Sequence, residues 1–219
     1  MTAALKINSV SYKYPNKNLL LSNINLEIKE GEIVCLIGKS GCGKTTLLNI
    51  AAGLIKPVEG NVRIGGTDIY NIKKNKLSSF RGENIGYIFQ SFNLLNNMNF
   101  LDNVAMPLEL SGCRKRLREE KAEELLEALE LYDKLDSYPY QLSGGEQQRA
   151  AIARALIRRP RIILADEPTG NLDSETERVI LGLLKDIRKK YNTSMLIVTH
   201  DEEVSSLGDR IINIKDGRI

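Results

Sequence analysis

A glycine-rich run in the first quarter of the chain carries the residue types that bind phosphate. Its members are Gly38, Lys39, Ser40, Gly41, Cys42, Gly43, Lys44, Thr45 and, one position on, Thr46. The first eight match the spacing G-x-x-x-x-G-K-[ST], in which glycines let successive backbone N–H groups face one anion. Lys44 is expected to reach the β- and γ-phosphates, and Thr45 to offer its hydroxyl to Mg²⁺. We therefore predict a nucleoside-triphosphate site, in which Cys42 is only a small loop residue.

Two carboxylates in the last third of the chain could complete this site. Asp166 and Glu167 follow the apolar run 162–165. Because adjacent residues of a strand point to opposite faces, the two carboxylates are expected to have different roles. Asp166 is predicted to hold Mg²⁺ together with Thr45, and Glu167 to polarise the water that attacks the γ-phosphorus. Without the phosphate loop, a helix cap or a turn would be the default interpretation of this pair.

Two further polar residues directly follow apolar runs. His200, the single histidine, comes after 195–199, and Gln90 comes after 85–89. A lone histidine more often has a structural role, but its position past a strand end favours a contact with the γ-phosphate. Gln90 is interpreted either as a ligand to Mg²⁺ and water or as a turn residue.

The elements that must position these residues alternate between strands and helices. Strands are predicted at 5–12, 24–28, 33–37, 61–64, 85–89, 162–165, 195–199 and 210–214, and helices at 44–52, 144–158 and 175–190. The continuously apolar run 34–37 indicates a strand buried on both faces. The alternation predicts an α/β fold with a mostly parallel sheet. Ligands of such sheets bind outside the carboxyl ends of the strands, where the candidate residues fall.

The middle of the chain, about 100–135, has a different pattern. Leu117, Leu125, Leu126 and Leu129 recur at helical spacing among charged residues, which predicts an inserted helical subdomain. We divide the single domain 1–219 into a nucleotide-binding core, 1–90 and 159–219, and a helical subdomain of about 91–158. The apolar face of the helix at 175–190 is expected to contain Val179, Ile180, Leu183, Leu184 and Ile187.

Composition and charge narrow the class of protein. The chain has 219 residues, of which 42% are hydrophobic and 27% charged, as in ordinary globular proteins. Net charge is +3, and the densest basic run, 114–118, is followed at once by two glutamates, so no nucleic-acid partner is predicted. No apolar run approaches the ~20 residues that cross a bilayer, and the N-terminus lacks the apolar stretch of a signal peptide. The three cysteines lack metal-ligand and disulfide spacing, so we expect a cytosolic protein.

A second candidate anion site lies far from the first in sequence. Ser143 precedes Gly144 and Gly145 at the predicted start of a helix. A serine N-cap and two glycines leave backbone N–H groups and the positive end of the helix dipole open to an anion.

This second site lies within the run Leu142-Ser143-Gly144-Gly145-Glu146-Gln147-Gln148-Arg149, which resembles the signature of the ABC-type ATPases. The resemblance extends over essentially the whole chain. It comprises the phosphate loop, the Q-loop residue Gln90, the signature residues Leu142–Glu146, the acidic strand end, the D-loop residue Asp173 and the H-loop residue His200. It implies a P-loop NTPase core with an N-terminal antiparallel β subdomain and an inserted helical subdomain. It also implies an A-loop aromatic that stacks on adenine, for which Tyr14 is preferred to Tyr12.

The family resemblance implies why one chain has two phosphate-binding helix starts. Two chains would pack head to tail, so that each ATP, with Mg²⁺, lies between the phosphate loop of one chain and the signature of the other. The pair is expected to be a homodimer, with a heterodimer as the alternative. Hydrolysis would release the interface and drive a separate transmembrane permease, which places the chain at the inner face of the cell membrane.

The run Pro168–Ser174 is similar to the MacB/LolD-like branch of these ATPases. That branch implies export or extraction of a lipoprotein, peptide or antibiotic. The alternative is a non-transport ATPase that transmits force to a permease-like membrane protein, as in cell division. An ATPase of chromosome maintenance or DNA repair fits less well, because the interval from Thr45 to Leu142 lacks sustained heptads and cysteine pairs.

One segment departs from the branch pattern. Residues 94–99 read Leu-Leu-Asn-Asn-Met-Asn, where relatives often read like Leu-Leu-Pro-x-Leu-Thr. This segment borders the groove where a permease would dock, so the departure leaves the identity of partner and cargo open.

Overall fold

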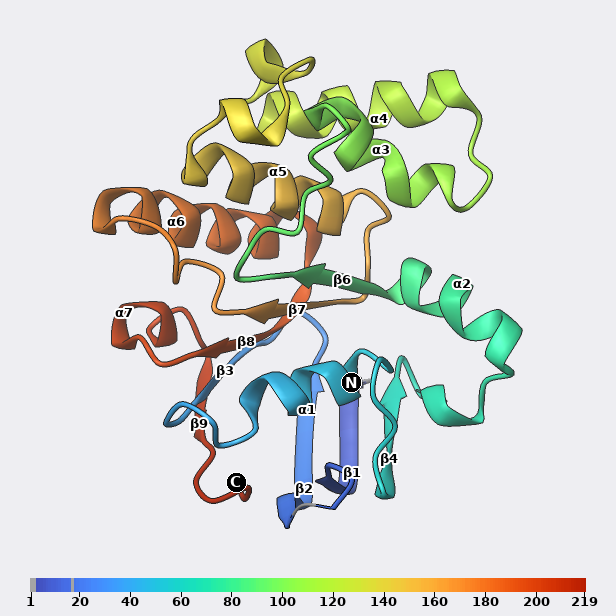
Figure 1. The fold of residues 1–219 in the computed structure, drawn as a ribbon, viewed down its shortest axis with the longest axis vertical. Coiled ribbons are helices and arrows are strands. Elements are labelled where there is room, and N and C mark those ends of the chain that lie inside the picture. Colours follow the sequence, from blue (N-terminus) through green and yellow to red (C-terminus); the bar gives the residue numbers. More distant parts are fainter. Residues whose placement is uncertain (1–2, 17) are drawn as a thin grey trace.

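Two β-sheets form the framework of the protein. A computed structural model describes residues 3–16 and 18–219 (Figure 1). The antiparallel sheet has the order β2-β1-β4-β5, and the second sheet has the order β6-β7-β8-β3-β9. Neighbouring strands of the second sheet are parallel, which confirms the predicted α/β class. The strands of the first sheet pair antiparallel, which confirms the N-terminal antiparallel subdomain. The strands are β1 (Ala3–Lys13), β2 (Leu19–Lys29), β3 (Ile33–Ile37), β4 (Glu59–Ile64), β5 (Thr67–Asp68), β6 (Ile85–Ile88), β7 (Ile162–Asp166), β8 (Ser194–Thr199) and β9 (Arg210–Asn213).

Helices cover both faces of the parallel sheet. Figure 1 shows α5 and α6 on one side, with α3 and α4 farther out, and α1 with the antiparallel strands on the other. The helices are α1 (Lys44–Ala51), α2 (Lys74–Asn84), α3 (Phe100–Glu109), α4 (Lys115–Ala128), α5 (Gly144–Leu156), α6 (Ser174–Tyr191) and α7 (Glu202–Ser205), with 3₁₀ turns η1 (Ile69–Asn71), η2 (Tyr132–Lys134) and η3 (Pro139–Gln141). Within residues 3–16 and 18–219, no helix is both long enough and apolar enough to cross a membrane.

Strand β3 contributes to two separate hydrophobic clusters. Ile33 and Cys35 pack into the cluster that contains α3 to α6, whereas Val34 and Leu36 pack into the cluster that contains α1 and the antiparallel sheet. All four side chains are fully buried. Because successive side chains of a strand point to opposite faces, a continuously apolar run is what a strand between two cores requires.

The helical segment between β6 and β7 shares one of these clusters. Phe100 of α3, Leu126 of α4 and Ile152 of α5 are fully buried together with side chains of the sheet. The segment 94–99, which departs from the branch pattern, is held by hydrogen bonds from a buried side chain of α3. The buried side chain of Asn103 accepts from the amide of Leu95 (2.7 Å) and donates to three carbonyls of residues 95–99.

Three local predictions need correction. Helix α2 was not predicted, because it buries no residue and therefore carries no apolar periodicity. Leu117, expected on the apolar stripe of the helical segment, is 45% exposed. Val179 is 51% exposed, because the buried stripe of α6 follows Ile180, Leu184 and Ile187 at i, i+4 and i+7, and Val179 lies to its side.

The strand order brings the candidate residues to one edge. Strands β6, β7, β8 and β3 are consecutive neighbours, and their carboxyl ends lead to Gln90, to Asp166 with Glu167, to His200 and to the phosphate loop. Residues more than a hundred positions apart in sequence therefore meet at one edge of the sheet.

Candidate active site

The phosphate loop connects β3 to α1 and turns sharply at its end. Gly43, the N-cap of α1, has a φ of 103°, a conformation that favours glycine. No side chain caps this helix start, so its first N–H groups remain available to an anion. The Lys44 ammonium donates to the carbonyl oxygens of Gly38 (2.7 Å) and Lys39 (3.0 Å) and is almost fully buried. The lysine thus fixes the shape of the loop from inside.

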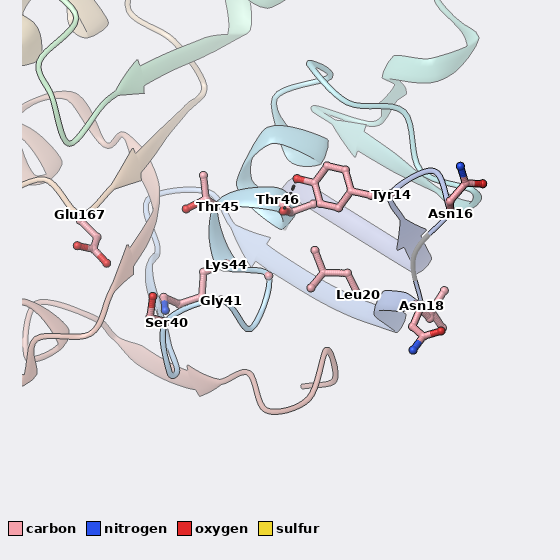
Figure 2. Close-up of a pocket in the computed structure, with 12 residues that line it drawn as sticks. Tyr14, Asn16, Asn18, Leu20, Ser40, Gly41, Lys44, Thr45, Thr46 and Glu167 are labelled. Atoms are coloured by element: carbon pink, nitrogen blue, oxygen red, sulfur yellow. Dashed lines mark hydrogen bonds between the residues drawn. The ribbon is translucent and has the colours of Figure 1, made fainter.

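A cleft of about 800 Å³ extends from this loop. Figure 2 shows Glu167 at one end and Tyr14 with Asn16 at the other. Among the predicted residues, the lining includes Tyr14, Ser40, Gly41, Gly43, Lys44, Thr45, Thr46 and Glu167. Gly38 and Lys39 instead hold Lys44, and Cys42 packs against the hydrophobic cluster beneath.

The two candidate aromatic residues occupy different positions. Tyr14 is 38% exposed and lines the cleft, and its hydroxyl lies 3.3 Å from the hydroxyl of Thr46. Tyr12 packs against the hydrophobic cluster and contacts the edge of the Tyr14 ring, with 5.1 Å between ring centroids. The ring of Tyr14 is therefore the one that a bound base could reach.

Asp166 and Glu167 have separate partners. The Thr45 hydroxyl donates to a carboxylate oxygen of Asp166 (3.1 Å). Burial raises the pKa of Asp166, and the charge of Glu167 adds to that effect, while the bond from Thr45 and the charge of Lys44 oppose it. A bound cation would favour the ionised form.

Glu167 lies at the junction of Gln90 and His200. Its backbone is left-handed, with a φ of 43°, and its amide donates to the carbonyl of Val198. Its carboxylate accepts from the Gln90 amide at 3.3 Å and lies 3.0 Å from Nδ1 of His200, whose side chain is 66% exposed. The strained backbone turns this carboxylate toward the cleft and away from the partner of Asp166.

The second helix start is built differently from the first. The Glu146 carboxylate accepts from the backbone amide of Ser143 (2.9 Å) and from its hydroxyl (2.8 Å), and the Ser143 hydroxyl accepts from the amide of Glu146 (3.3 Å). Burial alone would raise the pKa of Glu146, but the two bonds from Ser143, together with the charges of Lys134 and Arg149, hold the pKa below its usual value. Among the described residues lining the cleft, none comes from Leu142–Glu146.

The signature packs directly against the D-loop and α6. A Cβ on Gly145 would lie 2.5 Å from Cγ2 of Thr176, so a side chain at this position would force the helices apart. Asp173 caps α6 by accepting from the amides of Glu175 (3.1 Å) and Thr176 (2.9 Å). Leu142 packs against the neighbouring hydrophobic cluster.

Several contacts of the site had no counterpart in the sequence analysis. The side chain of Asn171 donates to the Gln90 carbonyl (2.8 Å), which ties the D-loop to the Q-loop. Asn16 and Asn18 line the cleft beyond Tyr14. The buried amide of Gln148 donates to the Pro168 carbonyl, just past Glu167. Asn16 and Asn18 could have been found from their proximity in sequence to Tyr14. The partners of Asn171 and Gln148 depend on the tertiary fold and had no such signal.

The fold and this arrangement together define a P-loop ATPase with an inserted helical segment. The family profile described as ABC transporter matches residues 21–170. The chain therefore belongs to the ABC transporter family, as an ATP-binding, ATP-hydrolysing subunit.

Individual relatives agree with this assignment. The chain is 43% identical to the ABC transporter ATP-binding protein YtrE of Bacillus subtilis, over 92% of this chain and 87% of that protein. It is 45% identical to a macrolide export ATP-binding/permease protein MacB of Rhodopirellula baltica, over 91% of this chain and 30% of that protein. The chain thus spans about a third of the MacB relative. It also resembles a dimeric structure of MJ0796, described as a bacterial ABC transporter cassette, with a TM-score of 0.89 and 42% identity over 98% of this chain and 96% of that one.

Proposed function

We propose that two copies of this chain form each complete catalytic site. The observation that carries this proposal is the separation of the two helix starts. The cleft with Lys44 and Thr45 contains no residue of 142–146 among the described residues that line it, although the exposed Ser143 begins a second helix elsewhere. A head-to-tail pair would bring residues 142–146 of one chain to the γ-phosphate held by the other.

On the phosphate side, the roles follow from position and charge. Tyr14 stacks on adenine, the loop residues Gly38–Thr46 surround the phosphates, and Lys44 exchanges its loop carbonyls for phosphate oxygens. A hard cation such as Mg²⁺ fits the oxygens of Thr45 and Asp166, which lie 3.1 Å apart, together with the amide oxygen of Gln90. When bound, Mg²⁺ neutralises charge on the β- and γ-phosphates. Phosphate and water would supply the other ligands, because the described residues contain no cluster of three acidic, histidine or cysteine ligands.

On the hydrolytic side, Glu167 is proposed as the general base. Its carboxylate is fixed by Gln90 and His200, which orients it for a water in line with the γ-phosphate. His200 is exposed enough to contact the γ-phosphate itself. Asp173, beside the signature, is proposed to contact the partner chain across the interface.

A transmembrane permease is the proposed partner, which would hold this chain at the inner face of the membrane. Named transporter and exporter relatives support it. We propose a lipoprotein, peptide or antibiotic as cargo. We also propose that residues 1–90 and 159–219 act as the nucleotide-binding core, while residues 91–158 carry the signature and contact the permease.

The variant Glu167→Gln tests this proposal. The amide keeps the size of the side chain but cannot accept the proton, so turnover should fall by about 10²–10⁴-fold. ATP binding should persist, and gel filtration with ATP should show a dimer that does not dissociate. Glu124→Gln, an exposed glutamate on α4, is the matched control and should hydrolyse ATP normally. A Glu167→Gln variant that hydrolyses ATP at the wild-type rate, or stays monomeric with ATP, would contradict the proposal.

A further inference from the structure

The turn that follows Gln90 has a backbone conformation that its own residues do not favour. Phe92 and Asn93 are both left-handed, with φ values of 59° and 51°. Asparagine tolerates this region, but a bulky aromatic residue there is an outlier. Within the turn, the amide of Phe92 donates to the carbonyl of Phe89 (3.1 Å), and the amide of Asn93 donates to that of Ser91 (2.5 Å). Contacts from elsewhere in the chain add to these local bonds.

Those contacts come from α5. The guanidinium of Arg154 donates to the carbonyl of Asn93 through one terminal nitrogen (2.5 Å) and to the carbonyl of Phe92 through the other (2.7 Å). Burial lowers the pKa of Arg154 to about 10. Within the part of the chain that the structure describes, its polar partners are these two carbonyls and no carboxylate. A half-buried cation therefore depends on this turn, and the turn on the cation.

The same turn is linked to both halves of the proposed catalytic site. On the signature side, Cζ of Phe92 lies 3.7 Å from where a Cβ of Gly144 would be, so the ring packs beside the start of α5. On the nucleotide side, the side chain of Gln90, two residues before the turn, contacts the Glu167 carboxylate. Ser143 caps the start of the 13-residue helix α5, and Arg154 lies in the last turn of the same helix. Displacement of the signature by a partner chain would thus move the turn and, with it, Gln90.

We propose that Arg154 is a positioning residue that clamps the left-handed turn at 92–93 and thereby sets the side chain of Gln90 against Glu167. This inference rests on the proposed roles of Gln90 and Glu167 in hydrolysis. Among the described residues, those that line the cleft do not include Arg154, so its effect is on the geometry of the reacting groups.

The first test compares Arg154→Met and Arg154→Lys with the wild type in steady-state ATP hydrolysis. Loss of the clamp should lower kcat by about 10- to 100-fold, because small misplacements of reacting groups have effects of that size. The KM for ATP should stay within about threefold, because the phosphate loop is intact. Lysine keeps the charge but cannot donate to both carbonyls in a fork, so its kcat should be intermediate. The control is Arg188→Met, which removes a guanidinium bound to the carbonyl of Gly31 and to the carboxylate of Asp209, and should leave kcat unchanged.

A double-mutant cycle distinguishes positioning from a general loss of stability. Glycine adopts the left-handed region without cost, so in a Phe92→Gly background Arg154→Met should lower kcat by a smaller factor than in the wild type. A structural role unrelated to the turn would give the same factor in both backgrounds. Equal factors would overturn the proposal, as would an Arg154→Met variant with wild-type kcat.

A spectroscopic measurement reports on the turn without turnover. The chain has no tryptophan, so Phe92→Trp introduces a single tryptophan at the turn, which can be excited apart from the tyrosines. Adding Arg154→Lys should shift its emission, whereas adding Arg188→Met should not, and no shift with the lysine would contradict the clamp. If Gln90→Ala left hydrolysis unchanged, the proposed function of Gln90 would fail, whereas a silent Arg154 with an essential Gln90 would refute only the clamp.

Discussion

The starts of α1 and α5 differ in which groups lie beside the positive end of the helix dipole. Helix α1 begins after a glycine-rich run and α5 begins with two glycines, and both present backbone N–H groups at the positive end of the helix dipole. At α1 no side chain caps these groups, and Lys44 adds a buried positive charge beside them. At α5 a capping box pairs two backbone amides, those of Ser143 and Glu146, and the side chain that lies there, the Glu146 carboxylate, is itself an anion.

This difference indicates an order of binding. The start of α1 is a site ready for phosphate before any partner arrives. The start of α5 already holds the Glu146 carboxylate in the free chain, so a phosphate that approaches it meets a negative charge. Nucleotide should therefore bind first to α1, and only the assembled dimer should engage α5. The predictions below test this asymmetry.

The largest effect is expected from Ser143→Asp. Aspartate is as good an N-cap as serine, so α5 should stay folded, but its charge would repel the partner's γ-phosphate. Turnover should become undetectable while single chains still bind ATP, as measured by hydrolysis assays and by titration with a fluorescent ATP analogue. Asn99→Asp at the N-cap of α3 is the control. Normal turnover in Ser143→Asp would show that the start of α5 takes no part in hydrolysis.

A smaller effect is expected from Lys44→Ala, and at the binding step. Charge-assisted hydrogen bonds contribute about 1.5–3 kcal/mol each, so the Kd for ATP should rise by roughly one to two orders of magnitude. Isothermal titration measures it directly. If Lys44→Ala bound ATP normally and failed only to dimerise, the two helix starts would not differ as described.

The smallest effect is expected from Glu146→Gln. Glutamine preserves the capping box but removes the charge that competes with phosphate. In a Glu167→Gln background, the ATP concentration for half-maximal dimerisation should fall by about two- to fivefold, the range for a single charge at a helix start. Glu127→Gln, an exposed glutamate on α4, changes net charge equally and should have no effect. An unchanged or raised ATP requirement would show that Glu146 does not compete.

The sequence predicted those parts of the molecule that depend on local pattern. Strand β3 and the glycine-rich loop between it and α1 were predicted at the correct residues, because apolar continuity and glycine spacing are local signals. The cap at Ser143 and Glu146 also had a local signal, the S-x-x-E spacing, which the sequence analysis did not use. The clamp by Arg154 had none, because an arginine on a helix and two carbonyls some sixty residues earlier meet only after the fold forms.

Strand β3, which both hydrophobic clusters share, has a consequence for hydrogen exchange. Its amides are bonded on both sides, to β8 and β9, and its side chains are buried on both faces. Exposing them to deuterium requires opening both cores at once, which approaches complete unfolding. The phosphate loop thus extends from the strand that is expected to exchange most slowly.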